Sequence, residues 1–363
     1  MAVNLRNKFW FVVLSCTCRF IFATTFIVSG FMKSIDPLGT ILTMESYLAA
    51  YNLVAPDWLV PICAIGLGAA ELIIGCMLLF NVYIRITSVI SVVVMTFFTI
   101  LTLLSATLFP VEDCGCFGDL IHLTPWQTFA KNVALLSMAI CFWYHYRQEQ
   151  LFETWKRDCM LFVIFAVLAI GLGVYSYLTL PLIDTTPYKT GVNIADEMNN
   201  SRAQRSQEEV VLVYRNLHTD ELHEFSVDDT TWQNDSIWVW VETRVEEDNA
   251  EAPTLLEFYV GDAEGDKTMQ LLAKPKLYML FMESSKYDED VREAFESVEQ
   301  YARVNGGEVV YITPENLDSV ECSYPCYNMD PKTMKTILRA EYGLVLLENG
   351  VIAEKYNYRS IPY

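Results

Sequence analysis

Two cysteines, Cys114 and Cys116, stand one residue apart in a short polar loop between two long apolar stretches. The residue between them, Gly115, tolerates the tight backbone turn that would bring the two thiols together. A disulfide closed over so short a loop is strained, and strained, exposed disulfides are labile and oxidising. The spacing predicts a reversible redox pair. Two alternatives stay open: an incidental pair of small residues, and metal binding together with His122.

Lys131 lies in the next apolar stretch, little more than one helical turn inside it and directly below the Cys114 loop. A nearby cation stabilises a thiolate, which is the form of cysteine that attacks a disulfide. We therefore expect Cys114, Cys116 and Lys131 to form the catalytic set. The alternative for Lys131 is an ammonium group that extends to the outer lipid headgroups.

Arg19 and Glu71 lie near the middle of the first and second apolar stretches. Charges inside a membrane are costly, so they usually face the interior of a bundle and mark function. The two stretches are expected to be antiparallel neighbours, which predicts an Arg19–Glu71 ion pair. We regard both residues as candidates for binding a cofactor, with a quinone as the candidate molecule. The alternative is a pair that only fixes the packing of two helices.

Five apolar stretches are long enough to cross a bilayer at about 20 residues each. They cover residues 9–32, 58–80, 84–109, 126–146 and 160–180. The Lys and Arg residues of the amino end, of the second short loop and of the 146–158 linker fall on one side if the amino end is cytoplasmic. The Cys114 loop and the chain after Leu180 would then be periplasmic, where disulfides persist. This predicts a multi-pass protein of the bacterial inner membrane.

Charge divides the 363-residue chain into two halves. Up to Leu180 there are nine Lys and Arg against ten Asp and Glu, whereas 16 and 35 follow after it. A nearly neutral membrane half is therefore joined to a strongly acidic soluble half. The acidic half and the lack of a basic aromatic patch argue against nucleic acid as a partner. The expected partners are the lipid bilayer and another envelope protein.

The soluble half divides into an acidic tether with a β-rich segment, 185–272, and an α/β unit, 273–363. The second part shows strand and helix patterns in the order β-α-β-α-β-β, which is the order of a thioredoxin-like domain. Its first helix is predicted over 289–304, Asp330 is the expected N-cap of the second helix, and Asn349–Gly350 is the expected tight turn of the final hairpin. Within it, Cys322 and Cys326 could close a structural disulfide or act as exchange partners. Residues 1–146 would form a four-helix membrane domain, and 147–184 a linker with the fifth span.

The other cysteines of the apolar stretches are interpreted as packing residues. Cys16 and Cys18 also stand one residue apart, but on a helix they point about 200° apart and cannot pair with each other. Cys141 is interpreted as small apolar packing toward the cytoplasmic side. Cys63 lies near the outer end of the second stretch, where it could approach Cys116.

Several of these residues resemble the DoxX/MauE family of small membrane proteins. The similarity covers about residues 16–143 and rests on Arg19, on 28–33 (VSGFMK), on Glu71, on 114–118 (CGCFG) and on Lys131. It implies a four-helix bundle broadly similar to that of vitamin K epoxide reductases. The family also implies thiol chemistry, because MauE is implicated in disulfide formation and DoxX-type proteins in quinone-coupled sulfur oxidation.

The longer layout resembles a Bacteroidota-type branch of this family with a C-terminal degenerate thioredoxin-like domain. That domain departs from true thioredoxins in two places. Residues 283–286 (ESSK) stand where a CxxC would open the first helix, and 341–343 (EYG) lack the proline that shapes the usual active site. We therefore expect the tail to dock a partner over the membrane thiols rather than to act as an independent oxidoreductase.

Three functions compete at this stage. The first is a membrane thiol–disulfide oxidoreductase that exchanges with a periplasmic thiol or thioredoxin-like protein and passes electrons onward to a quinone. The second is a non-enzymatic anchor or scaffold subunit of an envelope complex, with the Cys114–Cys116 pair as a structural staple. The third is a metal carrier, for which the ligand set is short.

Overall fold

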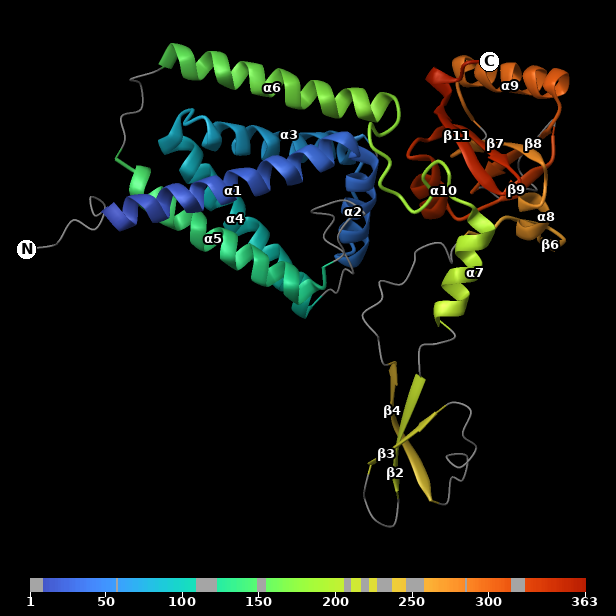
Figure 1. Cartoon of the computed structure of the whole chain (residues 1–363), viewed down its shortest axis with the longest axis horizontal. Helices are drawn as coiled ribbons and strands as arrows, with labels where there is room; N and C mark the ends of the chain where they lie inside the picture. Colours follow the sequence, from blue (N-terminus) through green and yellow to red (C-terminus); the bar gives the residue numbers. More distant parts are fainter. Residues whose placement is uncertain are drawn as a thin grey trace, which may run out of the picture.

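A computed structural model describes residues 9–56, 58–108, 123–148, 155–205, 210–216, 222–226, 237–245, 258–284, 286–314 and 324–363. The predicted catalytic residues Cys114 and Cys116, the alternative metal ligand His122, and Cys322 lie outside these residues. The chain forms an N-terminal helical bundle and a C-terminal α/β domain, which we call the tail (Figure 1).

Six helices make up the bundle. They are α1 (Phe9–Ile35), α2 (Pro37–Ala50), α3 (Leu59–Leu79), α4 (Ile84–Thr107), α5 (Pro125–Tyr146) and α6 (Trp155–Leu178). Among the described helices, α1, α3, α4 and α6 are long and apolar enough to cross a membrane. The predicted span 126–146 is also a helix, α5, which lies against α4 and α1 in the same bundle but is less apolar. The described bundle is that of a multi-pass membrane protein.

Close contact between α1 and α3 depends on glycine. A Cβ atom on Gly75 would lie 2.8 Å from the backbone nitrogen of Ile27, and one on Gly68 would lie 3.1 Å from Lys33 Cβ. Small residues let helix backbones approach in lipid, where helices gain little from the hydrophobic effect. These glycines set the register in which α1 and α3 run past each other. Beside this contact, Phe22 packs edge to face on Phe142 of α5, with ring centroids 5.3 Å apart.

The tail is built on a mixed sheet in the order β11-β10-β7-β8-β9-β5-β6. The central strands are β7 (Lys276–Met282) and β8 (Glu308–Thr313), which are parallel and joined through α9 (Glu289–Asn305). β10 (Tyr342–Glu348) is antiparallel to β7 and forms a hairpin with β11 (Val351–Asn357). The shorter elements are β9 (Cys326–Asn328), β5 (Gly261–Asp262), β6 (Gly265–Asp266), α8 (Thr268–Leu272), α10 (Pro331–Leu338) and the 3-10 turn η5 (Tyr358–Ser360).

Both faces of the sheet are buried at its central strands, which explains the continuous apolar run of β7. Leu277, Met279 and Phe281 enter one core, and the alternate residues Tyr278 and Leu280 enter the other. Successive strand side chains point to opposite faces, so a strand covered on both sides reads as unbroken hydrophobicity. The second core contains the apolar side of α9, whose predicted range of 289–304 matches the helix within one residue.

Local sequence signals for the tail are confirmed where they can be checked. Asp330 begins α10 as predicted, because its Oδ2 accepts a hydrogen bond of 2.8 Å from the backbone of Thr333. Asn349 and Gly350 both have positive φ, at 51° and 78°, as the tight hairpin turn requires. The order of strands and helices after residue 275 is as expected, while the thioredoxin-like assignment stays a prediction.

The core of the tail extends beyond the predicted range 273–363. Tyr188, Ile194 and Phe258, from the segment expected to be tether and separate β-rich region, are buried with the residues of β7 and β10. Ile194 opens a further helix, α7 (Ile194–Arg205), and Asn193 bridges Val351 of β11. In the part of the chain between α7 and Phe258, three strands form a separate sheet: β2 (Val210–Asn216), β3 (Leu222–Ser226) and β4 (Trp238–Val245) (Figure 1).

Candidate functional site

The predicted catalytic loop joins two helices whose facing ends are described. α4 ends at Thr107, and α5 begins with a capping box in which Thr124 and Gln127 exchange hydrogen bonds. Inside α5, buried Asn132 donates from Nδ2 to Thr102 Oγ1 of α4 at 3.2 Å. A buried amide paired across two helices fixes their relative position. Lys131 precedes this amide in the second turn of α5 and is half-buried. Its predicted effect on the loop cysteines stays a prediction, because the loop lies outside the described residues.

The predicted Arg19–Glu71 ion pair is wrong. Glu71 pairs instead with Lys33, whose Nζ lies 2.8 Å from Glu71 Oε2, and both side chains are buried. The same ammonium donates to Ser29 Oγ at 2.8 Å. The reason is helix register, because Gly68 packs on Lys33 and Gly75 on Ile27. That register brings Glu71 to the carboxyl end of α1, far from Arg19.

Arg19 lies near the opposite end of the bundle. Its guanidinium carbon is 5.4 Å from the centroid of the Tyr146 ring at the end of α5. Since 14 residues of helix separate Arg19 from Lys33, the two cations are about 21 Å apart along α1. Arg19 and Glu71 are therefore too far apart to line one cofactor site together. A cofactor role would have to be proposed for each residue separately.

The tail docks on the end of the bundle that carries α2 and the start of α5 (Figure 1). Arg339 Nε lies 3.2 Å from Asp36 Oδ2, and both side chains are buried. Asp36 also caps α2, because its Oδ1 accepts a hydrogen bond of 2.9 Å from the Gly39 backbone. Lys335 lies 3.0 Å from Glu283 and 3.8 Å from Glu45 of α2.

Two further contacts hold the chain where it leaves the membrane. Asn357 Nδ2 donates to the Thr179 carbonyl at 3.0 Å, and Lys355 Nζ lies 2.6 Å from Asp184 Oδ2. Burial alone would raise the pKa of Asp184, but the Lys355 ammonium and the hydrogen bonds from Thr186 hold that pKa below its usual value. The domain is therefore tied to α2, to the end of α6 and to the segment after it.

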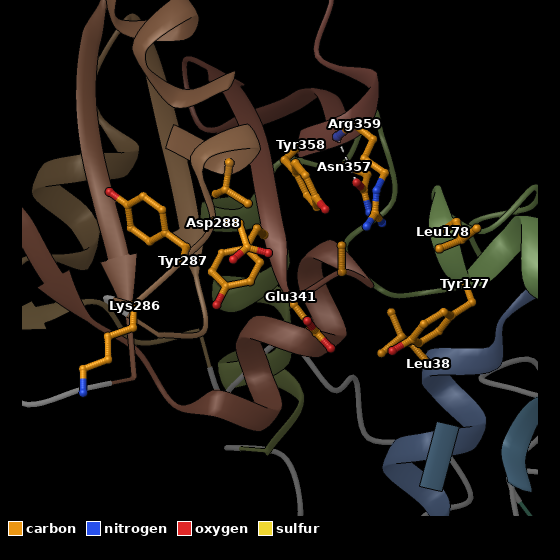
Figure 2. Close-up of a pocket in the computed structure, with 13 residues that line it drawn as sticks. Leu38, Tyr177, Leu178, Lys286, Tyr287, Asp288, Glu341, Asn357, Tyr358 and Arg359 are labelled. Carbon is orange, nitrogen blue, oxygen red and sulfur yellow. Dashed lines mark hydrogen bonds between the residues drawn. The ribbon is translucent and has the colours of Figure 1, made fainter. Parts of the chain in front are cut away.

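A cavity of about 350 Å³ opens at this junction (Figure 2). Leu38, Tyr177 and Leu178 line it from the bundle, while Glu341 and Tyr358 line it from the tail. The remaining lining residues include both acids and bases: Lys286, Tyr287, Asp288, Val291, Ala340, Tyr342, Asn357 and Arg359. The cavity lies at the end of the bundle where the tail docks, next to helix α2.

Glu341 is a carboxyl group of this cavity whose pKa is shifted by its surroundings. Burial raises the pKa of Glu341, the nearby Glu283 carboxylate raises it further, and Lys335 and Arg359 offset only part of the effect. The folded protein thus holds this proton more tightly than the unfolded chain does. Glu341 favours folding at pH values below its unfolded-state pKa and loses that contribution as the pH rises through the raised value.

The variant Glu341→Gln should therefore be more heat-stable than the native protein at about pH 8 and no more stable at about pH 4. The amide removes a buried charge at high pH, whereas the native side chain is already neutral at low pH. Thermal unfolding of the full chain in detergent measures the difference. Glu293→Gln, an exposed site on α9, is the matched control and should change little at either pH. A pH-independent effect of Glu341→Gln would contradict the assignment.

Among the described cysteines, Cys326 is bonded in a disulfide, and its partner lies outside the described residues. Cys16, Cys18, Cys63, Cys76, Cys141 and Cys159 are free thiols. Within the same part of the chain, no group of three or more His, Cys, Asp or Glu side chains is placed to hold a metal ion.

These features define a multi-pass membrane protein whose acidic half is an α/β domain docked on one end of the bundle. Residues 10–145 match the family model described as methylamine utilisation protein MauE. The match covers α1 to α5 and supports a membrane family of the MauE/DoxX type for that part of the chain. The chain matches no curated protein and no solved structure.

Proposed function

We propose that this protein is a membrane thiol–disulfide redox protein that supports disulfide formation or maturation of periplasmic proteins. The observation that carries the proposal is the Cys114–Gly–Cys116 spacing in a region similar to MauE. Support comes from the base of the loop, where the Asn132–Thr102 hydrogen bond holds α4 and α5 in register. The name of the family suggests a membrane protein in processes of the methylamine-utilisation type.

In this proposal a thiolate of a periplasmic dithiol attacks the oxidised Cys114–Cys116 disulfide and forms a mixed disulfide. The second thiol of the dithiol then displaces the loop cysteine, so the periplasmic protein is left oxidised and Cys114 and Cys116 are left reduced. Lys131 stabilises the thiolate from the first turns of α5. A membrane quinone would take the two electrons onward. The amino end is cytoplasmic and the tail periplasmic, so the acidic tail meets the partner, a thiol protein or thioredoxin-like protein, beside the loop.

The competing function is a non-enzymatic anchor or scaffold subunit of an envelope complex. One observation favours it: a buried ion pair, Asp36–Arg339, fixes the tail to the bundle. The tail also has 283–286 (ESSK) in place of a redox motif. Under this function the Cys114–Cys116 pair is a staple whose loss destabilises the loop and changes no electron transfer.

Exchange assays with the purified full chain separate the two functions. Cys114→Ser and Cys116→Ser should each abolish exchange with a reduced dithiol peptide, while both variants still insert in the membrane. Lys131→Met should slow alkylation of the reactive cysteine near neutral pH by roughly threefold to tenfold, because the thiolate loses a neighbouring cation. Cys63→Ser and the exposed Lys332→Met are the matched controls and should leave both rates unchanged.

Labelling of intact spheroplasts with a membrane-impermeant maleimide tests the compartment in the same experiment. Reduced Cys114 and Cys116 should react, whereas Cys159, at the start of α6, should not. Exchange that survives both serine substitutions would refute the redox function. Protection of the loop cysteines in intact spheroplasts would refute the proposed orientation.

A further inference from the structure

The cavity at the junction of bundle and tail has a charged lining that the proposed function does not use (Figure 2). Two bases, Lys286 and Arg359, and two acids, Asp288 and Glu341, lie around it. Within the described part of the chain, none of these four side chains forms a hydrogen bond or an ion pair. Opposite charges that share a cavity without pairing are available to a ligand that carries both charges.

The level of the cavity in the membrane follows from α6. This helix is long and apolar enough to cross a bilayer, and it ends at Leu178. Tyr177 and Leu178, in its last turn, line the cavity. The end of a membrane span lies near the lipid headgroups, where tyrosine is enriched. The cavity therefore lies at the level of the headgroups.

The bundle side of the cavity is apolar and continues onto exposed apolar side chains. Leu38 of α2 and Leu178 of α6 line the cavity, and Leu178 is exposed. Leu182 and Ile183, which follow α6 in the chain, are exposed as well. Apolar side chains at the end of a membrane span are covered by acyl chains in a bilayer. A lipid whose headgroup fills the cavity can keep its acyl chains on these side chains.

The tail side of the cavity is suited to an ammonium group. Three tyrosine rings form a row, in which the ring centroids of Tyr287 and Tyr342 are 6.2 Å apart and those of Tyr342 and Tyr358 are 6.3 Å apart. The face of an aromatic ring attracts a cation. Asp288 and Glu341 add two carboxylates, which accept hydrogen bonds from an ammonium group.

The bases near Glu341 do not fully balance its surroundings. Burial raises the pKa of Glu341, Glu283 raises it further, and Lys335 and Arg359 offset only part of the rise. The ammonium group of a ligand would supply the positive charge that the carboxylate needs.

Arg359 is placed to bind a phosphate. Its guanidinium carbon lies 4.6 Å from the centroid of the Tyr358 ring, a contact that orients the side chain. Figure 2 shows Arg359 on the same side of the cavity as Leu178, with Lys286 on the far side. A guanidinium group binds a phosphate through two parallel hydrogen bonds. A phosphate at Arg359 lies beside the exposed apolar side chains, where the acyl chains of a phospholipid would continue from it.

We propose that the junction cavity binds the headgroup of phosphatidylethanolamine. Arg359 binds the phosphate, Asp288 and Glu341 accept hydrogen bonds from the primary ammonium group, and the row of tyrosine rings flanks this group. A volume of about 350 Å³ suits a small headgroup. The bound lipid joins the bundle to the tail. The site involves neither loop cysteine, so it goes beyond the proposed function and does not depend on it.

The test is native mass spectrometry of the delipidated full chain in detergent, titrated with three lipids that have the same acyl chains. Phosphatidylethanolamine carries both charges, phosphatidylglycerol has the phosphate without an ammonium group, and a trimethylammonium lipid has no phosphate. Phosphatidylethanolamine should bind at least about tenfold more tightly than either of the others, because each of those leaves a charged group of the cavity without its partner. Glycerophosphoethanolamine, the soluble headgroup, should bind at least about tenfold more weakly, since it has no acyl chains.

Substitutions test the two halves of the site separately. Arg359→Gln should weaken binding of phosphatidylethanolamine about tenfold, through loss of a charge-assisted hydrogen bond. Asp288→Asn/Glu341→Gln should weaken it by a similar factor and strengthen binding of phosphatidylglycerol about tenfold, because no carboxylate then repels the anionic lipid. Damage to the fold does not produce such a gain. Lys332→Met and Glu293→Gln, at exposed sites outside the cavity, are the matched controls.

Three results would overturn the proposal. The first is phosphatidylglycerol binding to the native chain as tightly as phosphatidylethanolamine. The second is an unchanged lipid preference in both the Arg359→Gln chain and the Asp288→Asn/Glu341→Gln chain. The third is equally tight binding of the soluble headgroup, which would make the cavity a site for a small soluble zwitterion and not for a lipid.

Discussion

Replacing Lys33 by Met, or Glu71 by Gln, should each lower the free energy of unfolding of the bundle by about 3–5 kcal/mol. The two side chains form a buried ion pair of 2.8 Å between α1 and α3, and each single change leaves the other charge without its partner. Two responses limit the cost of an unpaired charge. Glu71, in the middle of α3, can take up a proton and become neutral. Lys33, two residues from the end of α1, can extend its ammonium group toward the lipid surface.

A double-mutant cycle separates pairing from packing. The Lys33→Met/Glu71→Gln chain should lose much less stability than the two single variants together, since no unpaired charge remains in it. Unfolding in mixed detergent micelles supplies the free energies. Lys332→Met and Glu293→Gln, both exposed sites in the tail, are matched controls expected to change the value by less than about 0.5 kcal/mol. Additive losses in the cycle would show that the pair contributes nothing as a pair.

The same pair shows where sequence reasoning stops for a membrane bundle. Membrane spans can be predicted from sequence because only long apolar helices cross the lipid core. The four described helices that are long and apolar enough all coincide with predicted stretches. Partners across helices depend on register, and here register depends on where Gly68 and Gly75 allow close approach. Depth estimated from helix length alone paired Glu71 with the wrong cation.

In the tail, the sequence was more informative because local rules act over a few residues. Asp330 and the Asn349–Gly350 turn were each recognisable from composition alone, and each forms the predicted cap or turn. The folding of Tyr188 and Ile194 into the core of the tail could not be foreseen. Those residues are separated from the sheet by a polar, acidic segment, and nothing in their own neighbourhood marks them as core.

Arg339 is the clearest example of a residue whose role depends on a distant partner. It ends α10 in the left-handed region, with φ of 56°, where glycine is usual and another residue costs about 1–2 kcal/mol. Its side chain is buried against Asp36, which lies about 300 positions earlier in the sequence. The buried ion pair with Asp36 is the contact through which the guanidinium stabilises the docked tail and can offset this backbone cost.

Replacing Arg339 by Met should therefore weaken docking of the tail by about 3–5 kcal/mol, since it leaves the Asp36 carboxylate buried without its cation. Hydrogen exchange of the full chain should become faster in α10 and in the first turn of α2. Asp36→Asn should also release the tail but keep α2 ordered, because an amide oxygen can still accept the hydrogen bond from Gly39. Asp36→Ala should release the tail and also loosen the first turn of α2, because alanine cannot accept the hydrogen bond from Gly39.

Two further variants distinguish the charge from the backbone and from nearby ion pairs. Arg339→Gly loses the same guanidinium but recovers the backbone cost, so it should be less destabilising than Arg339→Met by about 1 kcal/mol. Lys335→Met removes the partly exposed contacts with Glu283 and Glu45, and surface pairs of this kind contribute at most about 1 kcal/mol. If Lys335→Met accelerated exchange in α2 as much as Arg339→Met does, docking would depend on the rim of the junction and not on the buried Asp36–Arg339 pair.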